Sequence, residues 1–237
     1  MTNHTLDVSL KKTGRIVGLL FLFTLIIPLL NWTLVLSKFI VPENAIDTAH
    51  NIVTNEFLFR IGIINDLITS AVAMALAVAL YIILKSVNKN LAIFALFIKF
   101  TEAILWADMT LGNYVNLLIL KGQTSLTTSE SGQVQALVGL SLNSHMSKSA
   151  IAGVFLGLSS MIFFYLLFKS KLVPKILAGF GFISYTLIFF YDSMTILLPN
   201  YSNILVIQII SWGPSIIFEL TIGFWLLIKG INVQQEG

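Results

Sequence analysis

Seven ionisable residues interrupt the long apolar stretches of this 237-residue sequence, and they are the side chains best suited to chemistry. They are five acids and two bases: Arg60, Asp66, Lys99, Glu102, Asp108, Asp192 and Glu219. A charge at the centre of a membrane helix costs roughly 2.5–3.5 kcal/mol even on the lower scale, so such residues normally face a bundle interior, pair, or line water. All seven are therefore candidates for binding a ligand or a proton.

The surplus of acids over bases predicts an unusual site. A low-dielectric interior does not hold so many carboxylates ionised, so we expect some of Asp66, Glu102 and Asp108 to be protonated or to hold a cation. Protonated carboxyls can relay protons, and ionised carboxyls can select a cationic ligand. The alternative is that these residues only hold helices together through hydrogen bonds.

The positions of the charges along their helices also predict ion pairs. Arg60 and Asp192 fall near the same end of their helices, and Lys99 and Glu219 have similar depths from the other end. Lys99 and Glu102 are three residues apart and can meet on one helix. Two acids therefore compete for Lys99.

Metal-dependent or nucleophilic chemistry has weaker support. The chain has no cysteine and three histidines, and neither H-E-x-x-H nor G-x-S-x-G occurs. His50 and His145 fall on the same predicted side as Asp66 and Asp192, so a zinc site is an alternative to two loop histidines. We assign no catalytic residue, metal or cofactor from the sequence.

The elements that must position these residues are membrane helices. Apolar residues make up 57% of the chain and charged residues 11%, against roughly 45–50% and 25% in soluble domains. The apolar residues form blocks of about 20 or more, the length that spans a hydrocarbon core of about 30 Å. We therefore predict an all-α, polytopic transmembrane helix bundle, with residues 1–237 as a single transmembrane domain. Its six expected spans are residues 14–36, 57–84, 91–120, 149–168, 174–198 and 204–228.

The distribution of basic residues predicts the orientation. With the N-terminus inside, nine basic residues fall on the cytoplasmic side: Lys11, Lys12, Arg15, Lys85, Lys89, Lys169, Lys171, Lys175 and Lys229. Three fall outside: Lys38, Lys121 and Lys148. This asymmetry places both termini in the cytoplasm, and residues 41–55 and 121–148 are expected as short interfacial helices on the outer side. The net charge of +3 thus reflects topology, and we predict no nucleic-acid partner.

Five motifs follow one another along the spans and their turns. They are Arg60-x5-Asp66, Lys85-x2-Asn88-x-Asn90-Leu91, Lys99-x2-Glu102, Lys169-Ser170-x3-Pro174-Lys175 and Pro214-x4-Glu219-x5-Trp225-Leu226-Leu227-x-Lys229-Gly230. In this order and with six spans, they resemble a bacterial membrane-protein family catalogued only as a domain of unknown function. The resemblance covers nearly the whole chain. It implies a multi-pass bacterial plasma-membrane protein and implies no activity.

Three functions remain open on this sequence, all with the lipid bilayer as a partner. We favour a non-enzymatic protein that binds or moves a small polar or cationic solute, or protons, through an acid-lined cavity between the second, third, fifth and sixth helices. The second is an intramembrane enzyme for a lipid-type substrate, in which Asp66, Asp108 and Asp192 bind metal or act as acid and base with help from His50 or His145. The third is a scaffold subunit without a site.

Self-association bears on the first of these functions. Six helices without a visible inverted repeat are few for a secondary transporter, so transport would require a homo-oligomer. The Gly153-x3-Gly157 spacing permits a close helix contact, which we assign to packing within the chain, with self-association as the alternative.

Overall fold

The computed structural model describes residues 3–41, 44–122, 128–143, 145–198 and 204–232, with backbone alone for 3–9, 128–131, 143 and 145–148. Within these ranges the chain is helical and has no strand. The helices are α1 (Asn3–Leu34), the 3₁₀ turn η1 (Leu36–Lys38), α2 (Ala45–Thr54), α3 (Glu56–Leu84), α4 (Lys89–Lys121), α5 (Thr128–Asn143), α6 (His145–Ser170), α7 (Lys175–Leu197) and α8 (Leu205–Lys229). Six of them, α1, α3, α4, α6, α7 and α8, are long and apolar enough to cross a membrane. The prediction of six membrane-capable helices is therefore confirmed.

Local sequence signals set several helix ends. Asn44 and Asn88 cap α2 and α4, since their side-chain oxygens each accept a backbone N–H three residues later at 3.0 Å. Pro174 precedes the first turn of α7, where its lack of an N–H costs no helical hydrogen bond. Gly230 ends α8 with a positive φ of 70°, a conformation that suits glycine.

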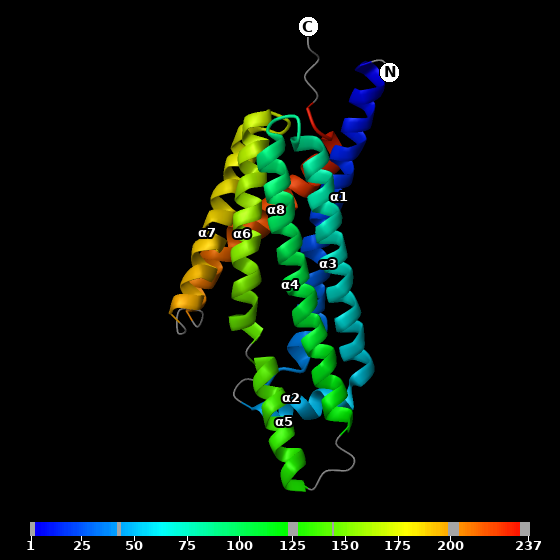
Figure 1. Cartoon of the computed structure of the whole chain (residues 1–237), viewed down its shortest axis with the longest axis vertical. Coiled ribbons are helices and arrows are strands. Elements are labelled where there is room, and N and C mark those ends of the chain that lie inside the picture. The colour runs from blue at the N-terminus through cyan, green and yellow to red at the C-terminus, as the bar shows by residue number, and fades with distance from the viewer. Residues whose placement is uncertain (1–2, 42–43, 123–127, 144, 199–203, 233–237) are drawn as a thin grey trace.

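The six long helices form a closed ring. Going around it, α1 contacts α3, α3 contacts α4, α4 contacts α6, α6 contacts α7, α7 contacts α8, and α8 returns to α1. In Figure 1 the start of α1 and the end of α8 lie together at one end of the bundle, which we call the terminus end. The helices α2 and α5 lie at the opposite end, which we call the α2/α5 end.

A hydrophobic core fills the ring toward the terminus end. Its fully buried members include Val17 from α1, Leu84 from α3, Leu167 from α6 and Leu226 from α8. Helices α1 and α8 approach closely here, because a Cβ atom added to Gly18 would lie 2.6 Å from the Leu227 backbone nitrogen. This end of the ring is therefore closely packed.

A second hydrophobic core joins α2 and α5 to the ends of α3 and α4. It includes Ala49 and Ile52 of α2, Phe59 of α3, Leu117 of α4 and Val138 of α5. The helices α2 and α5 lie within the segments 41–55 and 121–148, and their predicted position at a membrane interface stays a prediction.

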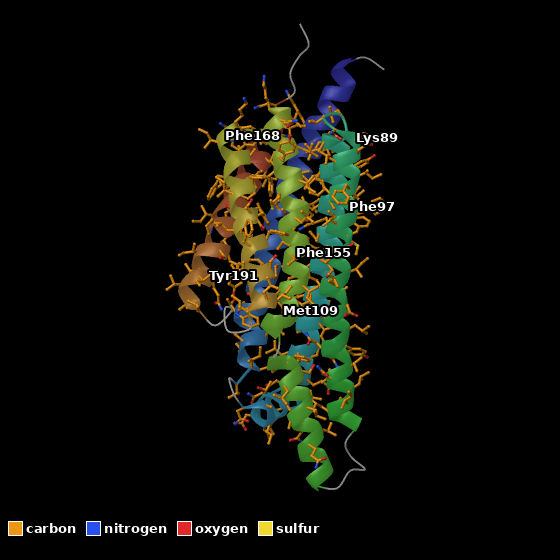
Figure 2. All side chains as sticks on the ribbon, turned by 60° about the vertical axis from the view of Figure 1, so that its left-hand side comes forward. Lys89, Phe97, Met109, Phe155, Phe168 and Tyr191 are labelled. Atoms are coloured by element: carbon orange, nitrogen blue, oxygen red, sulfur yellow. The ribbon has the colours of Figure 1, made fainter. Side chains whose placement is uncertain are left out.

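The outer surface of the bundle is apolar. Phe97 on α4 and Ile217 on α8 are 63% and 60% exposed, and Figure 2 shows Phe97 projecting outward from its helix. A continuous apolar exterior on helices of this length fits contact with lipid tails. Figure 2 also shows Lys89 at the terminus end, where the first turn of α4 begins.

Candidate functional site

A cavity of about 750 Å³ lies inside the helix ring, within the size range of sites for drug-sized molecules. Its lining comes from all six long helices, so α1 and α6 join the four helices that the sequence predicts around a cavity. Five of the seven candidate residues line it: Asp66, Lys99, Glu102, Asp192 and Glu219. The structure therefore brings most of the intramembrane charges to one place.

One ion pair lies in the inner part of the cavity. Lys99 Nζ lies 2.6 Å from Glu102 Oε2, and both side chains are buried. Glu219 accepts a hydrogen bond from the Tyr185 hydroxyl. The predicted pair between Lys99 and Glu219 is wrong, because Glu102, one turn along the same helix, takes the lysine.

Asp66 is held by a residue of the first helix. The Asn31 amide donates to Asp66 Oδ1 at 2.7 Å and to the Gly62 carbonyl at 3.0 Å. Asn31 is 1% exposed, so its two bonds fix α1 against α3 inside the bundle. Sequence reasoning missed Asn31, although a lone amide in an apolar span was a detectable signal.

Asp192 has the least satisfied carboxyl of the cavity. Its side chain is 3% exposed, and among the described residues its Oδ2 atom has no hydrogen-bond partner. The same holds for Thr195 Oγ1, which lines the cavity one turn further along α7. Gly153 of α6 makes room for Asp192, because a Cβ atom there would overlap the carboxylate. A buried polar atom without a partner costs about 1–3 kcal/mol, so these two acceptors favour a hydrogen-bond donor in the cavity.

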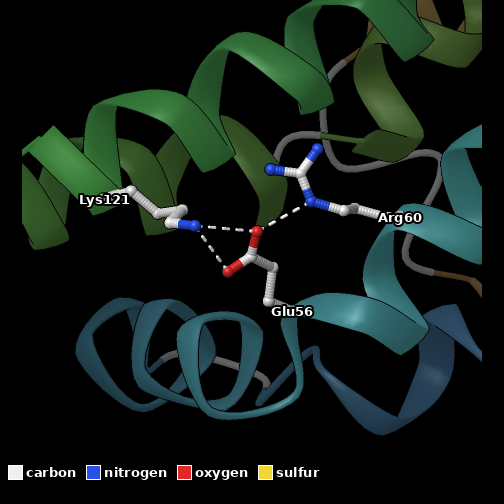
Figure 3. A network of polar contacts seen from close by, with 3 residues as sticks. All are labelled: Glu56, Arg60 and Lys121. Carbon is white, nitrogen blue, oxygen red and sulfur yellow. Dashed lines mark hydrogen bonds and ion pairs between the residues drawn. The ribbon is translucent and has the colours of Figure 1, made fainter.

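Arg60 lies outside the cavity, in a polar network that joins α3 to α4 (Figure 3). Its Nε atom lies 2.7 Å from Glu56 Oε1, and Lys121 Nζ lies 2.9 Å from Glu56 Oε2. The Arg60 guanidinium also lies 5.6 Å from the centre of the Tyr114 ring. The predicted pair of Arg60 with Asp192 is wrong, because Glu56 is one helical turn away and holds the arginine at the α2/α5 end.

Asp108 is separate from the other acids. It is exposed on α4 and borders a smaller hollow of about 250 Å³ together with Asn113, Ser141 and Ile151. Of the residues around this hollow, Met109 and Asn113 also line the large cavity, whereas Asp108 does not. The structure thus assigns Asp108 to the outside of α4, against α5 and α6.

The histidines add no metal site in the part of the chain that is described. His50 is exposed on α2, and the side chain of His145 lies outside the described residues. Within the described residues no group of three or more histidine, aspartate or glutamate side chains could hold a metal ion. The zinc alternative with His145 stays a prediction.

The sequence matches one family over residues 16–230, a range that includes every residue lining the large cavity. The chain belongs to the family described as a domain of unknown function (DUF4386). The resemblance drawn from the five motifs is therefore confirmed. No curated protein and no solved structure matches the chain.

The motifs of this DUF4386 protein fall into two groups in the structure. Those containing Asp66, Lys99 and Glu219 bring side chains into the cavity. The motifs that begin at Lys85 and Lys169 form the turns at the terminus end, between α3 and α4 and between α6 and α7. Site and turn residues are thus distinguishable only once the helices are placed.

Other cavity features of the DUF4386 chain gave little or no signal in the sequence. Tyr185 and Thr195 are ordinary residues of an apolar helix until the fold aims them at Glu219 and the cavity. The Gly153-x3-Gly157 spacing predicts a close helix contact within the chain, which is confirmed, since Gly153 faces Asp192 and Gly157 faces Phe189 of α7.

Proposed function

We propose that this DUF4386 protein binds a small organic cation in its intramembrane cavity. The observation that carries the proposal is that four carboxyl groups and one lysine line a single cavity of ligand size. Among the described residues, Lys99 pairs with Glu102, and no ion pair joins Asp66, Asp192 or Glu219 to a base. A cationic ligand supplies the charge that this site lacks.

The walls of the cavity support an organic cation over an inorganic ion. Most of its lining is apolar, and Phe21, Phe164 and Tyr185 form an aromatic floor. Phe164 in turn packs edge-to-face against Phe218, with ring centroids 4.6 Å apart. Aromatic faces attract cations that carry apolar groups, and they offer no oxygen ligands to a hydrated metal ion.

The packed hydrophobic core supports binding of a solute in the cavity over its free passage through the bundle. The cavity extends from Thr195 and Gln208, in the parts of α7 and α8 far from the terminus end, to Phe21 and Leu80. Between that floor and the terminus end the ring is filled by buried apolar side chains such as Val17 and Leu226. A solute in the cavity therefore meets a closed core.

We further propose the placement of the chain in the membrane. Residues 1–237 form a single transmembrane domain of a bacterial plasma membrane, with both termini cytoplasmic and α2 and α5 at the outer interface. The support is that the turn residues Lys85 and Lys171, with Lys229, lie at the same end as the start of α1, as expected of a cytoplasmic side.

The two other functions fit the geometry less well. The enzyme needs Asp66, Asp108 and Asp192 to act together, and Asp108 borders a different hollow. A scaffold gives no reason for an unpaired buried carboxyl in a cavity of ligand size. Binding of a cation accounts for both the unpaired carboxyl and the size of the cavity.

Thermal unfolding of the purified protein tests the proposal. Hexylammonium, hexanol and hexanoate share a chain and differ in charge, and a ligand at one hundred times its Kd stabilises a fold by about 2.7 kcal/mol. We expect hexylammonium alone to raise the Tm. Glu219→Gln, which keeps an acceptor for Tyr185, should weaken the effect, and Asp108→Asn should leave it unchanged. Equal stabilisation by hexanoate, or none by hexylammonium, would contradict the proposal.

A further inference from the structure

The exposed part of the cavity lining lies on two helices only. Among the described lining residues, four are exposed: Leu29 and Trp32 of α1 and Ile209 and Ile216 of α8. The other described lining residues are buried or half-buried. Residues that border the cavity and also reach the outer surface mark its mouth, which therefore lies between α1 and α8.

The packing of α1 and α8 places this mouth along the side of the bundle. The two helices cross tightly at Gly18 and Gly223, where a Cβ atom on Gly18 would lie 2.7 Å from the Gly223 carbonyl oxygen. Figure 1 shows α8 leaning away from α1 toward α7 as it leaves the terminus end. Leu29 and Ile216 lie beyond the crossing by about 16 Å and 10 Å along their helices, at about 1.5 Å per residue.

Both helices at the mouth contain an internal proline. Pro28 lies in α1, where it also lines the cavity, and Pro214 lies in α8. A proline has no N–H for the carbonyl four residues earlier, and it commonly bends a membrane helix. These positions favour a gap between two helices that are tightly joined only near the terminus end.

Because α1 and α8 are both membrane spans, this gap faces lipid tails. Leu29, Ile209 and Ile216 are 47%, 59% and 37% exposed there. A ligand that enters through an apolar gap in this position must itself partition into the bilayer. It needs an apolar tail as well as the charged group that the acids require.

The polar head has a defined place on α7, the neighbour of α8 in the ring. Asp192 and Thr195, three residues apart on α7, both line the cavity and both hold a buried oxygen without a hydrogen-bond partner among the described residues. Two acceptors call for a group that donates hydrogen bonds, which an ammonium with N–H groups does and a trimethylammonium does not. The head group of the ligand is therefore an ammonium that carries N–H groups.

We infer that the ligand is a long-chain amine taken from the bilayer, which passes between α1 and α8 and places its ammonium group at Asp192 and Thr195. Its apolar tail then lies along Leu29 and Ile216 in the mouth. This inference rests on the proposed binding of a cation and names the chemical class of that cation.

Tryptophan fluorescence can follow such a ligand, because Trp32 borders the mouth and Trp225 does not line the cavity. The probe is dodecylammonium brominated on its tail, titrated into protein in phosphatidylcholine nanodiscs. One variant keeps Trp32 as its sole tryptophan and a matched variant keeps Trp225, with phenylalanine at the other three positions. We expect saturable quenching of Trp32 and only weak, linear quenching of Trp225.

Head-group variants separate specific binding from partition into the lipid. We expect the apparent Kd at Trp32 to rise about tenfold in Asp192→Asn, as for loss of one charged hydrogen bond. A similar rise is expected for the brominated trimethylammonium analogue, and a smaller one in Thr195→Val. Asp108→Asn serves as the matched control and should keep the wild-type Kd.

The outcomes distinguish this inference from the proposed function. Linear quenching of Trp32 in a protein that hexylammonium still stabilises would overturn the lateral mouth and leave cation binding in place. Equal binding of the trimethylammonium analogue would overturn the hydrogen-bonded head. If neither hexylammonium nor the brominated dodecylammonium binds, both the inference and the proposed function are overturned.

Discussion

At the scale of single residues, two glycines on one face of α6 have different neighbours. Gly153 faces the end of the Asp192 side chain, whereas Gly157 faces the Phe189 backbone, whose Cα atom lies 2.8 Å from an added Cβ. A side chain can rotate away, but a helix backbone cannot move without separating α6 from α7. The two positions should therefore respond differently to the same added methyl group.

We predict that Gly157→Ala lowers stability by about 1–3 kcal/mol, the usual cost of overpacking. Gly153→Ala should cost less and should instead weaken hexylammonium binding, because it displaces the Asp192 carboxylate. Thermal unfolding with and without hexylammonium measures both effects. Equal loss of Tm in the two variants, with equal binding, would show that Asp192 does not depend on Gly153.

Side-chain pairs within one helix were predictable from the sequence, and pairs between helices were not. Lys99 and Glu102 were predicted as a pair because three residues along a helix fix their separation without knowledge of the fold. Arg60 and Asp192 were paired by depth alone, and depth says nothing about which side of a helix faces which neighbour. Tyr185 became a partner of Glu219 only through the packing of α7 on α8.

At the scale of elements, α2 and α5 approach each other most closely at one glycine. Gly139 of α5 lies directly against Ala45, the first residue of α2, with no space for a Cβ atom. Gly132 on the same helix has open space around its missing Cβ. Gly139 is therefore a test position and Gly132 is its matched control on the same helix.

We predict that Gly139→Ala loosens α5 from α2, whereas Gly132→Ala is neutral or stabilising by up to about 1 kcal/mol through better helix propensity. Hydrogen exchange of α2 and α5 in nanodiscs measures the difference. Faster exchange in both variants, or in neither, would argue that the Gly139 contact does not hold these helices.

The elements were more predictable than their packing. The six spans follow from the length of apolar blocks, which needs no tertiary information. The closed ring, the side mouth and the second core at Phe59 and Leu117 depend on which helix faces meet. A single sequence carries little signal for such contacts when nearly every face is apolar.

At the scale of the whole molecule, the absence of cysteine from the chain allows a clean test of orientation. Ser86, in the turn between α3 and α4, and Asn55, between α2 and α3, are both exposed and lie at opposite ends of the bundle. Each can carry a single cysteine, so that labelling reports one position only.

We predict that a membrane-impermeant maleimide labels Asn55→Cys in intact bacterial cells and labels Ser86→Cys only after the cells are permeabilised. The physical reason is that Lys85 and Lys89 beside Ser86 resist translocation across the membrane. The reverse labelling pattern would show that the orientation is inverted, with both termini outside the cell. The mouth between α1 and α8 would then draw its ligand from the opposite leaflet, because the exposed lining residues lie on the α2/α5 side of the Gly18 crossing.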